Sequence, residues 1–241
     1  RSRRAERAGH RQRRSPPPER LFPTTARPCS PCCAAATPGA WISAVSADRV
    51  LAGVVLAGGT SRRMGRDKAT MPHPAGGSAG GSMVQRTVDV LATRCEPVFV
   101  VAAQHQVLPD LGAARVVRDV LSSAGPLPAT GLGLAAAAAA GCQRAFVCAV
   151  DMPALTVRLI DELAGSGDAD DDADAVLAWD GRDHYLAAVY RTALAGRIAV
   201  LVSGGERRMR SLTDAVRTRR VVLSDPGMLT NMNTPAAGGA E

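Results

Sequence analysis

One stretch of the sequence, residues 54–68, constrains the fold more than any other. It begins as a short, β-branched apolar run, breaks at Gly58 and Gly59, and continues as a basic turn. Such a run predicts a buried parallel strand, and paired glycines let the backbone turn closely around a bound group because no Cβ intervenes. The basic side chains after the glycines are Arg62, Arg63, Arg66 and Lys68. Backbone N–H groups and positive charges would therefore converge on one place, as a polyphosphate requires.

The single lysine of the chain lies at the end of this stretch. The sequence has 29 Lys and Arg residues, and all of them except Lys68 are arginine. A compact ammonium on a flexible stem suits a phosphate better than the planar fork of arginine does. The spacing matches neither the Walker loop nor the G-x-G-x-x-G fingerprint, and an ordinary strand–loop–helix connection with an exposed basic face stays open as an alternative.

Strand and helix patterns alternate from residue 50 onward, which predicts an α/β fold. We expect a three-layer α/β/α, Rossmann-like domain with a mostly parallel sheet. The expected strands are 97–101, 115–117, 145–150 and 220–223, and the expected helices are 83–94, 133–141, 157–164, 193–203 and 209–218. Runs at 176–179 and 185–190 around an Asp-Gly turn predict a small antiparallel hairpin, with His184 as a hairpin or pocket residue rather than a catalyst. The Pro-, Gly- and Ala-rich residues 72–82 predict a flexible loop.

Two aspartates follow predicted strands. Asp151 closes the most strongly apolar run, where open α/β sheets have their ligand crevice, and Pro153 fixes the turn that aims it. Beside a phosphate loop, Asp151 is predicted to bind Mg²⁺, although taken alone it is equally suited to cap the helix expected after it. Asp119 lies in a predicted loop, residues 118–127, that contains a Gly-Pro turn.

The first 49 residues differ in composition from the rest. They carry ten arginines against three acidic residues, whereas residues 50–241 carry 19 basic and 19 acidic groups. We therefore predict that residues 1–49 are a disordered, basic, proline-rich extension and that residues 50–241 form the folded domain. Because the folded part carries no net charge, the high isoelectric point does not indicate nucleic-acid binding.

Cysteines and apolar runs argue against several other classes of protein. Cys29 and Cys32 form a C-x-x-C pair without a second pair at zinc-site spacing, and the cysteines at 95, 142 and 148 are expected to be small buried residues in a reducing compartment. The acidic run 168–174 lacks the central Gly and terminal Glu of an EF-hand and predicts a solvated loop. With no apolar run long enough for a membrane span and no apolar secretory core within residues 1–49, a cytoplasmic protein is expected.

Several separated motifs resemble one family. Residues 56–68 resemble the signature L-A-G-G-x-S-x-R-M-G-x-D-K of the nucleotidyltransferases related to molybdenum cofactor guanylyltransferase, the MobA family, at each fixed position. An acidic residue before Gly-Pro-Leu, within residues 119–127, and an Asn-x-Asn-Thr-Pro segment at 231–235 follow the family pattern in the same order. The resemblance implies that residues 50–241 are a nucleotidyltransferase domain.

The resemblance also implies an activity: transfer of GMP from GTP to the terminal phosphate of molybdenum-bearing molybdopterin, with release of pyrophosphate. The residues that it assigns to catalysis are Lys68, Asp151 and Arg63, with Asp151 as the Mg²⁺ ligand. Those that it assigns to nucleotide or acceptor binding are Leu56, Ala57, Gly58, Gly59, Lys68, Asp119 and Asp151, together with Asn231 and Asn233 on the molybdopterin side. Because the attacking phosphate is already anionic, none of the four histidines is expected to be a general base. Transient contact with molybdoenzymes or cofactor chaperones is expected; membranes and nucleic acids are not.

One departure from the family pattern leaves nucleotide choice open. Some relatives have an asparagine after the second strand that contacts the nucleotide, whereas residues 101–103 are Val, Ala and Ala here. Cytidylyltransferase relatives resemble L-A-A-G where this chain has L-A-G-G, which favours GTP over CTP. Three more distant classes of protein also stay open: a sugar-phosphate or methylerythritol-phosphate nucleotidyltransferase, a non-catalytic nucleotide- or cofactor-binding protein, and a nucleic-acid-binding protein that uses residues 1–49.

Overall fold

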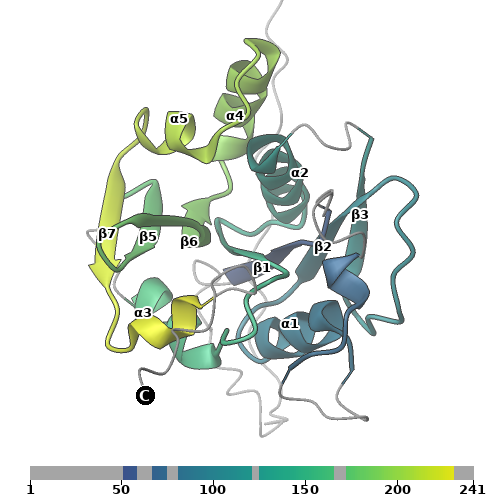
Figure 1. Ribbon diagram of the computed structural model, residues 1–241. Coiled ribbons are helices and arrows are strands. Elements are labelled where there is room, and N and C mark those ends of the chain that lie inside the picture. The colour runs from purple at the N-terminus through teal and green to yellow at the C-terminus, as the bar shows by residue number, and fades with distance from the viewer. Residues whose placement is uncertain (1–50, 59–66, 75–80, 121–124, 166–171, 231–241) are drawn as a thin grey trace, which may run out of the picture. The chain divides into compact units, whose positions relative to one another are not determined.

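A seven-stranded sheet forms the centre of the computed structural model (Figure 1). The structure describes residues 51–58, 67–74, 81–120, 125–165 and 172–230. The chain divides into two units, Arg1–Ile42 and Ser43–Glu241, and every described residue belongs to the second. The predicted disordered extension at 1–49 lies outside the described residues and stays a prediction.

Strands and helices alternate through the described residues, as the sequence predicts. The strands are β1 (Leu51–Leu56), β2 (Val98–Ala103), β3 (Arg115–Asp119), β4 (Arg144–Ala149), β5 (Ala175–Trp179), β6 (Asp183–Arg191) and β7 (Thr218–Val222). The helices are α1 (Met83–Ala92), α2 (Pro126–Ala139), α3 (Val157–Gly165), α4 (Leu194–Ser203) and α5 (Met209–Thr213), with short 3-10 helices η2 (Lys68–Thr70) and η4 (Pro226–Leu229).

The sheet is parallel except at one strand. Its order is β3-β2-β1-β4-β6-β5-β7. β1 pairs in parallel with β2 and β4, β2 with β3, and β5 with β7, whereas β6 pairs antiparallel with both of its neighbours. The prediction of a mostly parallel sheet with a small antiparallel hairpin is therefore confirmed, and within the described sheet the reversal is confined to β6.

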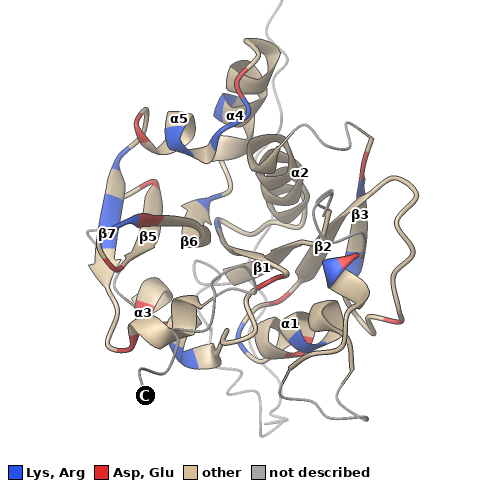
Figure 2. Cartoon of the chain, viewed as in Figure 1, with Lys and Arg blue, Asp and Glu red and all other residues tan. Residues whose placement is uncertain are grey.

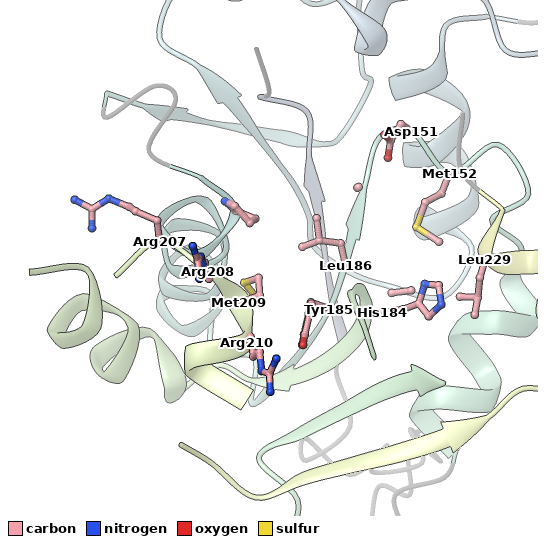
Figure 3. Close-up of a pocket in the computed structure, with 13 residues that line it drawn as sticks. Asp151, Met152, His184, Tyr185, Leu186, Arg207, Arg208, Met209, Arg210 and Leu229 are labelled. Atoms are coloured by element: carbon pink, nitrogen blue, oxygen red, sulfur yellow. The ribbon is translucent and has the colours of Figure 1, made fainter. Parts of the chain in front are cut away.

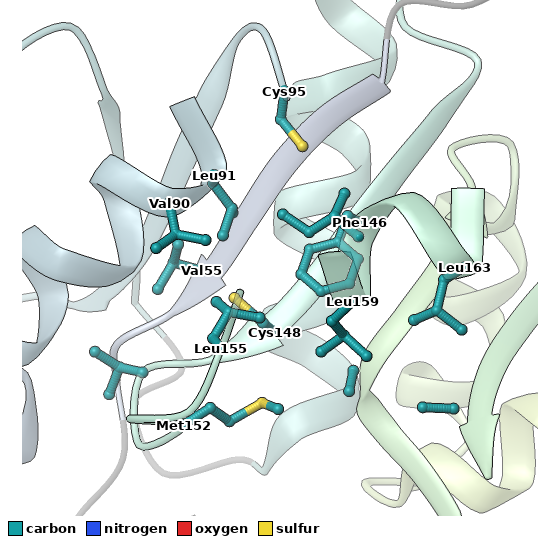
Figure 4. Packing of buried hydrophobic residues seen from close by; sticks show 14 of the residues in the cluster. Val55, Val90, Leu91, Cys95, Phe146, Cys148, Met152, Leu155, Leu159 and Leu163 are labelled. Carbon is teal, nitrogen blue, oxygen red and sulfur yellow. The ribbon is translucent and has the colours of Figure 1, made fainter. Parts of the chain in front are cut away.

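Helices cover both faces of the sheet, which confirms the three-layer architecture. In Figure 1, α2, α4 and α5 lie on one face, and α1 and α3 lie on the other. Each face has its own apolar cluster, and β1 contributes to both, with Val54 in one and Val55 in the other. This alternation is expected for a strand that is buried on both sides. Figure 4 shows the α1 and α3 side, where Leu91 and Leu159 pack near Phe146 of β4.

The helix α2 begins at Pro126, not at Gly133 as the sequence pattern predicts. Gly125 has a φ of 100°, a conformation that glycine adopts readily, and Pro126 follows at the start of the helix, where its missing N–H is not needed. The Gly-Pro pair therefore starts the helix instead of continuing a loop. Farther along α2, a Cβ on Gly133 would lie 2.3 Å from Cγ1 of Val54, so glycine is what lets this helix approach β1 so closely.

Three other predicted boundaries are wrong. α5 ends at Thr213 instead of residue 218, because Thr218 already pairs with Ala175 as the first residue of β7. β7 therefore covers 218–222 instead of 220–223. β3 continues to Asp119, which pairs with Ala103, so Asp119 ends a strand and does not lie in a loop. β1 begins at Leu51, three residues before the apolar run at residue 54, and the short helices η2 and η4 have no counterpart in the prediction. The other helices and strands agree with the prediction to within two residues at each end.

The two ends of the predicted flexible segment 72–82 are joined to each other. Pro72 and Ser82 form an antiparallel bridge, and the backbone N–H of His73 donates to the carbonyl oxygen of Gly81 at 3.2 Å. Residues 75–80 lie outside the described residues. The two ends of the segment are therefore fixed to each other just before α1 begins.

Some of the described helices and strands carry no charged side chain. β1, β2 and α2 contain none, and Figure 2 shows charged residues instead on β3, α5 and β7. β3 and β7 are the two edge strands of the sheet, where arginines discourage pairing with further strands. In the described part of the chain, no helix has both the length and the apolar character needed to cross a membrane.

Candidate active site

The strand order places one crevice at the carboxyl ends of β1 and β4. From β1 the sheet continues through β2 to β3 in one direction, and the chain then returns through α2 to β4 on the other side of β1. Such a reversal point is where open α/β sheets bind ligands. Leu56 and Ala149 pair in the ladder, so the segments that follow these two strands begin side by side.

The segment after β1 passes close to the end of β2. The N–H groups of Ala57 and Gly58 both donate to the carbonyl oxygen of Val101, at 2.9 and 3.1 Å. A Cβ on Gly58 would lie 3.1 Å from the backbone nitrogen of Ala103, tighter than most Cβ contacts. Leu56 and Ala57 are buried, whereas Gly58 is exposed at the crevice. A side chain at Gly58 would need the end of β2 to shift by a few tenths of an ångström, so glycine suits the point where the chain leaves the sheet.

The chain returns to the crevice at Lys68, the first residue of η2. Asp67 caps this short helix, because its Oδ1 accepts a hydrogen bond from the N–H of Ala69 at 3.0 Å. Nζ of Lys68 donates to Oδ2 of Asp151 at 3.0 Å, and the two side chains are 17% and 19% exposed. The structure therefore brings together the two residues that the sequence assigns to phosphate and metal binding.

A second contact joins the same two segments. Nε2 of His73 lies 3.1 Å from the carbonyl oxygen of Pro153, and because a carbonyl oxygen only accepts, Nε2 is the donor. His73 is buried, at 9% exposure. The turn that carries Asp151 is therefore held from the η2 side at two points, and His73 has a structural role that no sequence motif indicates.

Asp151 suits a magnesium ion that is completed by substrate. Among the described residues, no group of three or more His, Cys, Asp or Glu side chains is arranged to hold a metal. Mg²⁺ usually binds through one or two carboxylates and takes its other ligands from water and substrate phosphates. The single carboxylate of Asp151 fits that mode of binding, whereas a structural metal site would need several protein ligands.

A pocket of about 570 Å³ lies beside Asp151, and Lys68 is not among the residues that line it (Figure 3). Figure 3 shows Asp151 and Met152 at one side of the pocket and the arginines of the segment before α5 at the other. The lining residues are Pro126, Ala149, Asp151, Met152, His184, Tyr185, Leu186, Ala187, Arg207, Arg208, Met209, Arg210 and Leu229. A predominantly apolar wall with arginines at one side can hold a flat organic group that carries an anionic end.

The floor of this pocket comes from β6, the reversed strand. His184 lines the pocket, as the sequence predicts, and its Nε2 lies 2.7 Å from Oδ1 of Asp180 in the preceding turn. Burial alone would raise the pKa of Asp180, but contacts with His184 and Arg182 outweigh it and hold that pKa below its ordinary value. Burial raises the pKa of the neighbouring Tyr185 hydroxyl, so this phenol stays neutral at neutral pH.

A carboxylate organises the arginine segment that forms the pocket's opposite wall. Glu206 accepts hydrogen bonds from the backbone N–H groups of Arg207 and Arg208 at 2.7 and 2.9 Å. A hydrogen bond from the Ser211 hydroxyl, followed by these backbone contacts, lowers the pKa of Glu206 to about 2. The guanidinium of Arg207 donates to the carbonyl oxygens of Val202 and Glu206, which directs it into the loop itself.

Other predicted site residues lie apart or outside the described chain. Asp119 is buried at the end of β3, three strands from β4, which corresponds to about 14 Å at ordinary strand spacing. It therefore belongs to the β3 side of the crevice and not to the immediate surroundings of Asp151. Gly59, Arg63, Asn231 and Asn233 fall outside the described residues. Leu229, which lines the pocket, lies just before the asparagines in the chain.

Two parts of the site have no counterpart among the sequence predictions. Residues 204–208 are expected from sequence only to join the helices 193–203 and 209–218, although the arginines at 207, 208 and 210 are a signal for an anionic ligand. Gln106, in the turn after β2, contacts both ends of the segment that follows β1. No motif marks a single glutamine, and its position becomes apparent only from the fold.

A glycine-containing segment after the first strand, and a lysine in contact with a carboxylate across the reversal point of the sheet, are features of α/β proteins that carry out chemistry at a nucleotide. This chain belongs to the MobA-like NTP transferase family, whose domain model matches residues 53–221. It is accordingly a nucleotidyltransferase, and the family resemblance of its motifs is confirmed.

Close relatives come from mycobacteria. The chain is 59% identical over 186 residues to a protein of Mycobacterium marinum named as a probable molybdenum cofactor guanylyltransferase, an alignment that covers 77% of this chain and 90% of the relative. A protein of Mycobacterium tuberculosis with the same name is 58% identical over the same length and shares. The alignments therefore cover almost the whole of each relative.

Solved structures show the same fold at low sequence identity. A protein of Aquifex aeolicus superimposes with a TM-score of 0.62 and 22% identity, covering 79% of this chain and 97% of that one. Molybdopterin-guanine dinucleotide biosynthesis protein A of Archaeoglobus fulgidus superimposes with a TM-score of 0.58 and 18% identity, and the match covers 77% of this chain and 93% of that one. For the 2-C-methyl-D-erythritol 4-phosphate cytidylyltransferase of Thermus thermophilus, the TM-score is 0.54 and the identity 15%, and the match covers 78% of this chain and 94% of that one. The fold is thus shared by enzymes of different specificity, so it does not decide the nucleotide.

Proposed function

We propose that this protein transfers GMP from GTP to the terminal phosphate of molybdopterin bearing molybdenum, forming the guanine dinucleotide and releasing pyrophosphate. The observation that carries the proposal is the contact between Lys68 and Asp151 at the reversal point of the sheet. The names of the mycobacterial relatives, at 58–59% identity, supply the substrate class.

The reaction is an in-line displacement at the α-phosphorus of GTP. An oxygen of the acceptor phosphate forms a bond to that phosphorus, and the bond to the oxygen that bridges to the β-phosphate breaks. Pyrophosphate leaves with the electron pair of that bond. The acceptor oxygen is already anionic, so no side chain has to remove a proton, and catalysis consists of positioning and charge neutralisation.

The nucleotide side of the site is the segment after β1. Leu56, Ala57 and the two following glycines are proposed to lie against the base and phosphates. The N–H groups of Ala57 and Gly58 are already bonded to Val101, so Gly58 is proposed to contribute an exposed backbone with no Cβ to keep the ligand away. Lys68 and Arg63 are proposed to neutralise the phosphates. Asp119 at the end of β3 is proposed to bind the nucleoside part, because β3 is distant from the phosphate end at Asp151.

Asp151 is proposed to hold Mg²⁺ through its carboxylate. The bound ion supplies neutralisation of charge on the phosphates, which is the contribution that divalent metals make to phosphoryl chemistry. Lys68, at 3.0 Å, keeps this carboxylate oriented toward the nucleotide side. Because Asp151 contacts Lys68 and also lines the pocket, the reacting phosphorus is proposed to lie next to Asp151.

The acceptor side is the pocket beyond Asp151. We propose that Arg208 and Arg210 attract the acceptor's phosphate while the apolar wall contacts the pterin. Asn231 and Asn233 are proposed to contact the same substrate, and Leu229 in the pocket wall leads the chain toward them. A cytoplasmic location and transient contacts with molybdoenzymes or cofactor chaperones remain predictions from the sequence.

Labelled GTP tests the reaction type. The full chain, Mg²⁺ and molybdenum-loaded molybdopterin are mixed with GTP that carries the label at either the α- or the γ-phosphate. Transfer of GMP places the α label in the dinucleotide and the γ label in pyrophosphate. Release of the γ label as inorganic phosphate, with GDP as the other product, would mean hydrolysis and would contradict the proposal. Nucleotide binding without turnover in a folded sample would favour a non-catalytic binding protein.

A further inference from the structure

We infer that Gln106 is a positioning residue for nucleotide binding: its side-chain amide ties together the two ends of the segment between β1 and η2 and thereby fixes Lys68. Gln106 lies in the turn after β2 and is half-buried. It does not belong to any motif of the sequence and lies outside the residues proposed to bind substrate or metal. Because this role rests on the proposed function, its test needs a readout that does not depend on turnover.

The amide of Gln106 uses both its donor and its acceptor. Nε2 donates to the carbonyl oxygen of Ala57 at 3.1 Å and to Oδ2 of Asp67 at 2.8 Å. Oε1 accepts from the backbone N–H of Ala103 at 3.1 Å, at the end of β2. Ala57 is the first residue after β1, and Asp67 is the residue before Lys68. The side chain of Gln106 therefore holds Ala57, where the chain leaves β1, and Asp67, just before η2, next to the end of β2.

The tie extends to Lys68 through the second oxygen of the same carboxylate. Oδ2 of Asp67 accepts from Gln106, while Oδ1 accepts from the N–H of Ala69 and caps η2. Holding this carboxylate in place therefore fixes the first turn of η2, whose first residue is Lys68. From there the ammonium reaches Asp151.

The turn that carries Gln106 is itself anchored to the sheet. Nη1 of Arg118, on β3, donates to the carbonyl oxygen of Ala103 at 3.1 Å and to that of Gln106 at 2.7 Å. A further backbone bond closes the turn from the N–H of Gln106 to the carbonyl oxygen of Ala103. Three strands, β1, β2 and β3, thus contribute to the position of one amide.

Gln106 lies close in the chain to residues 101–103, where the sequence departs from the family pattern. The expected asparagine is absent there, and an amide is supplied a few residues later at the same end of β2. In this structure the amide contacts the protein on either side of residues 59–66. Its role is to hold the backbone that meets the nucleotide.

Three variants test the role. Gln106→Ala removes all three side-chain contacts. Gln106→Glu keeps the size but sets a carboxylate against two acceptors, the Ala57 carbonyl and the Asp67 carboxylate. Gln143→Ala is the matched control, because Gln143 is an exposed glutamine just before β4, at the opposite, amino-terminal edge of the sheet.

Steady-state kinetics of the full chain separate positioning from a merely structural role. We expect Gln106→Ala to lower kcat/KM for GTP by about ten- to a hundredfold, because small misplacements of catalytic groups have effects of this size. Gln106→Glu is expected to lower kcat/KM for GTP further. In both variants, KM for molybdopterin and the melting temperature should change little. Wild-type KM and kcat for GTP in folded Gln106→Ala would overturn the inference, as would a loss that only follows a lower melting temperature.

Hydrogen exchange of the free protein gives the readout that needs no turnover. Gln106→Ala should speed exchange of the Gly58 and Ala69 amides, which lie at the two tied ends, while amides of β4 keep the wild-type rate. Unchanged exchange at both ends would overturn the tie itself. If the wild-type protein does not turn over GTP but the variant shows this local exchange, the proposed function fails and the positioning contact stands.

Discussion

Nζ of Lys68 lies 3.0 Å from Oδ2 of Asp151, although the two residues are 83 positions apart in the chain. One follows the glycine-rich segment after β1, and the other follows β4, the strand beside it. Their contact joins the part of the site proposed for phosphates to the part proposed for the metal. Both side chains are largely buried, so each has its charge compensated where water is restricted.

Removing either partner should stop turnover with the fold retained. Lys68→Ala and Asp151→Asn are each expected to lower the rate of pyrophosphate release by roughly 10²- to 10³-fold, the usual effect of losing one preorganised charge-stabilising group. The rate is measured at saturating GTP and Mg²⁺, and circular dichroism establishes folding.

The control for this loss is an ion pair of similar length at the surface. Arg158 and Glu162 on α3 are 2.9 Å apart, with the arginine 66% exposed. Arg158→Ala should leave the rate unchanged, because exposed pairs contribute little. Turnover at the wild-type rate in Lys68→Ala or Asp151→Asn would remove that residue from the mechanism.

Loss of an arginine from the pocket should affect the acceptor and not the nucleotide. Arg208→Ala is expected to raise KM for molybdopterin about tenfold, the effect of losing roughly 1.4 kcal/mol from a charge-assisted contact. KM for GTP should stay the same, because Arg208 lines the pocket proposed for the acceptor, whereas Lys68 does not. Arg219→Ala, on the exposed edge strand β7, is the matched control. An increase in KM for GTP alone would mean that the pocket belongs to the nucleotide.

Two glycine substitutions in helices should have opposite effects on stability. A Cβ at Gly133 would lie 2.3 Å from Val54, so Gly133→Ala is expected to lower the free energy of unfolding by about 1–3 kcal/mol through overpacking. A Cβ at Gly196 in α4 would have no neighbouring atom within 4 Å, so Gly196→Ala should raise the free energy of unfolding by about 0.5–1 kcal/mol. Urea unfolding measures both, and a stabilised Gly133→Ala variant would contradict the close packing of α2 on β1.

The carboxylate of Glu206 should make stability depend on acidic pH. Its pKa falls from an ordinary 4.5 to about 2 in the folded protein, chiefly through the Ser211 hydroxyl and the backbone N–H groups of Arg208 and Arg207. Because the folded-state pKa is the lower one, the stabilisation is fully present above pH 4.5 and is lost as pH falls toward 2. Glu206→Gln should therefore flatten the dependence of melting temperature on pH in this window. Parallel curves for wild type and Glu206→Gln would contradict the contacts of this loop.

Most helices and strands were predictable because the apolar pattern that indicates them is local in the sequence. The buried β-branched runs of β1, β2 and β4 and the apolar stripe of α1 need no tertiary information. The start of α2 was missed because Gly125-Pro126 forms a turn in one context and a helix start in another, and only packing distinguishes them. The end of α5 was missed because Thr218 pairs with a strand 43 positions earlier in the chain.

Residues of the candidate site were predictable from the sequence only where they belong to a motif. Lys68 and Asp151 were identified separately, and their contact depends on strand order, which no local pattern encodes. Gln106 and Arg208 act through the shape of turns that bring them to the crevice. A single polar residue in a turn is indistinguishable in sequence from a solvated one.

The measurement that tests the central claim most directly is a competition between GTP and CTP at equal concentration, with the full chain, Mg²⁺ and molybdenum-loaded molybdopterin in one mixture. Mass spectrometry of the product identifies the transferred nucleotide, and pyrophosphate release gives the rate. We predict molybdopterin guanine dinucleotide as the dominant product, with pyrophosphate in equal amount. Cytosine dinucleotide as the main product would contradict the guanylyltransferase assignment, and no dinucleotide from a folded, nucleotide-binding sample would contradict the transfer itself.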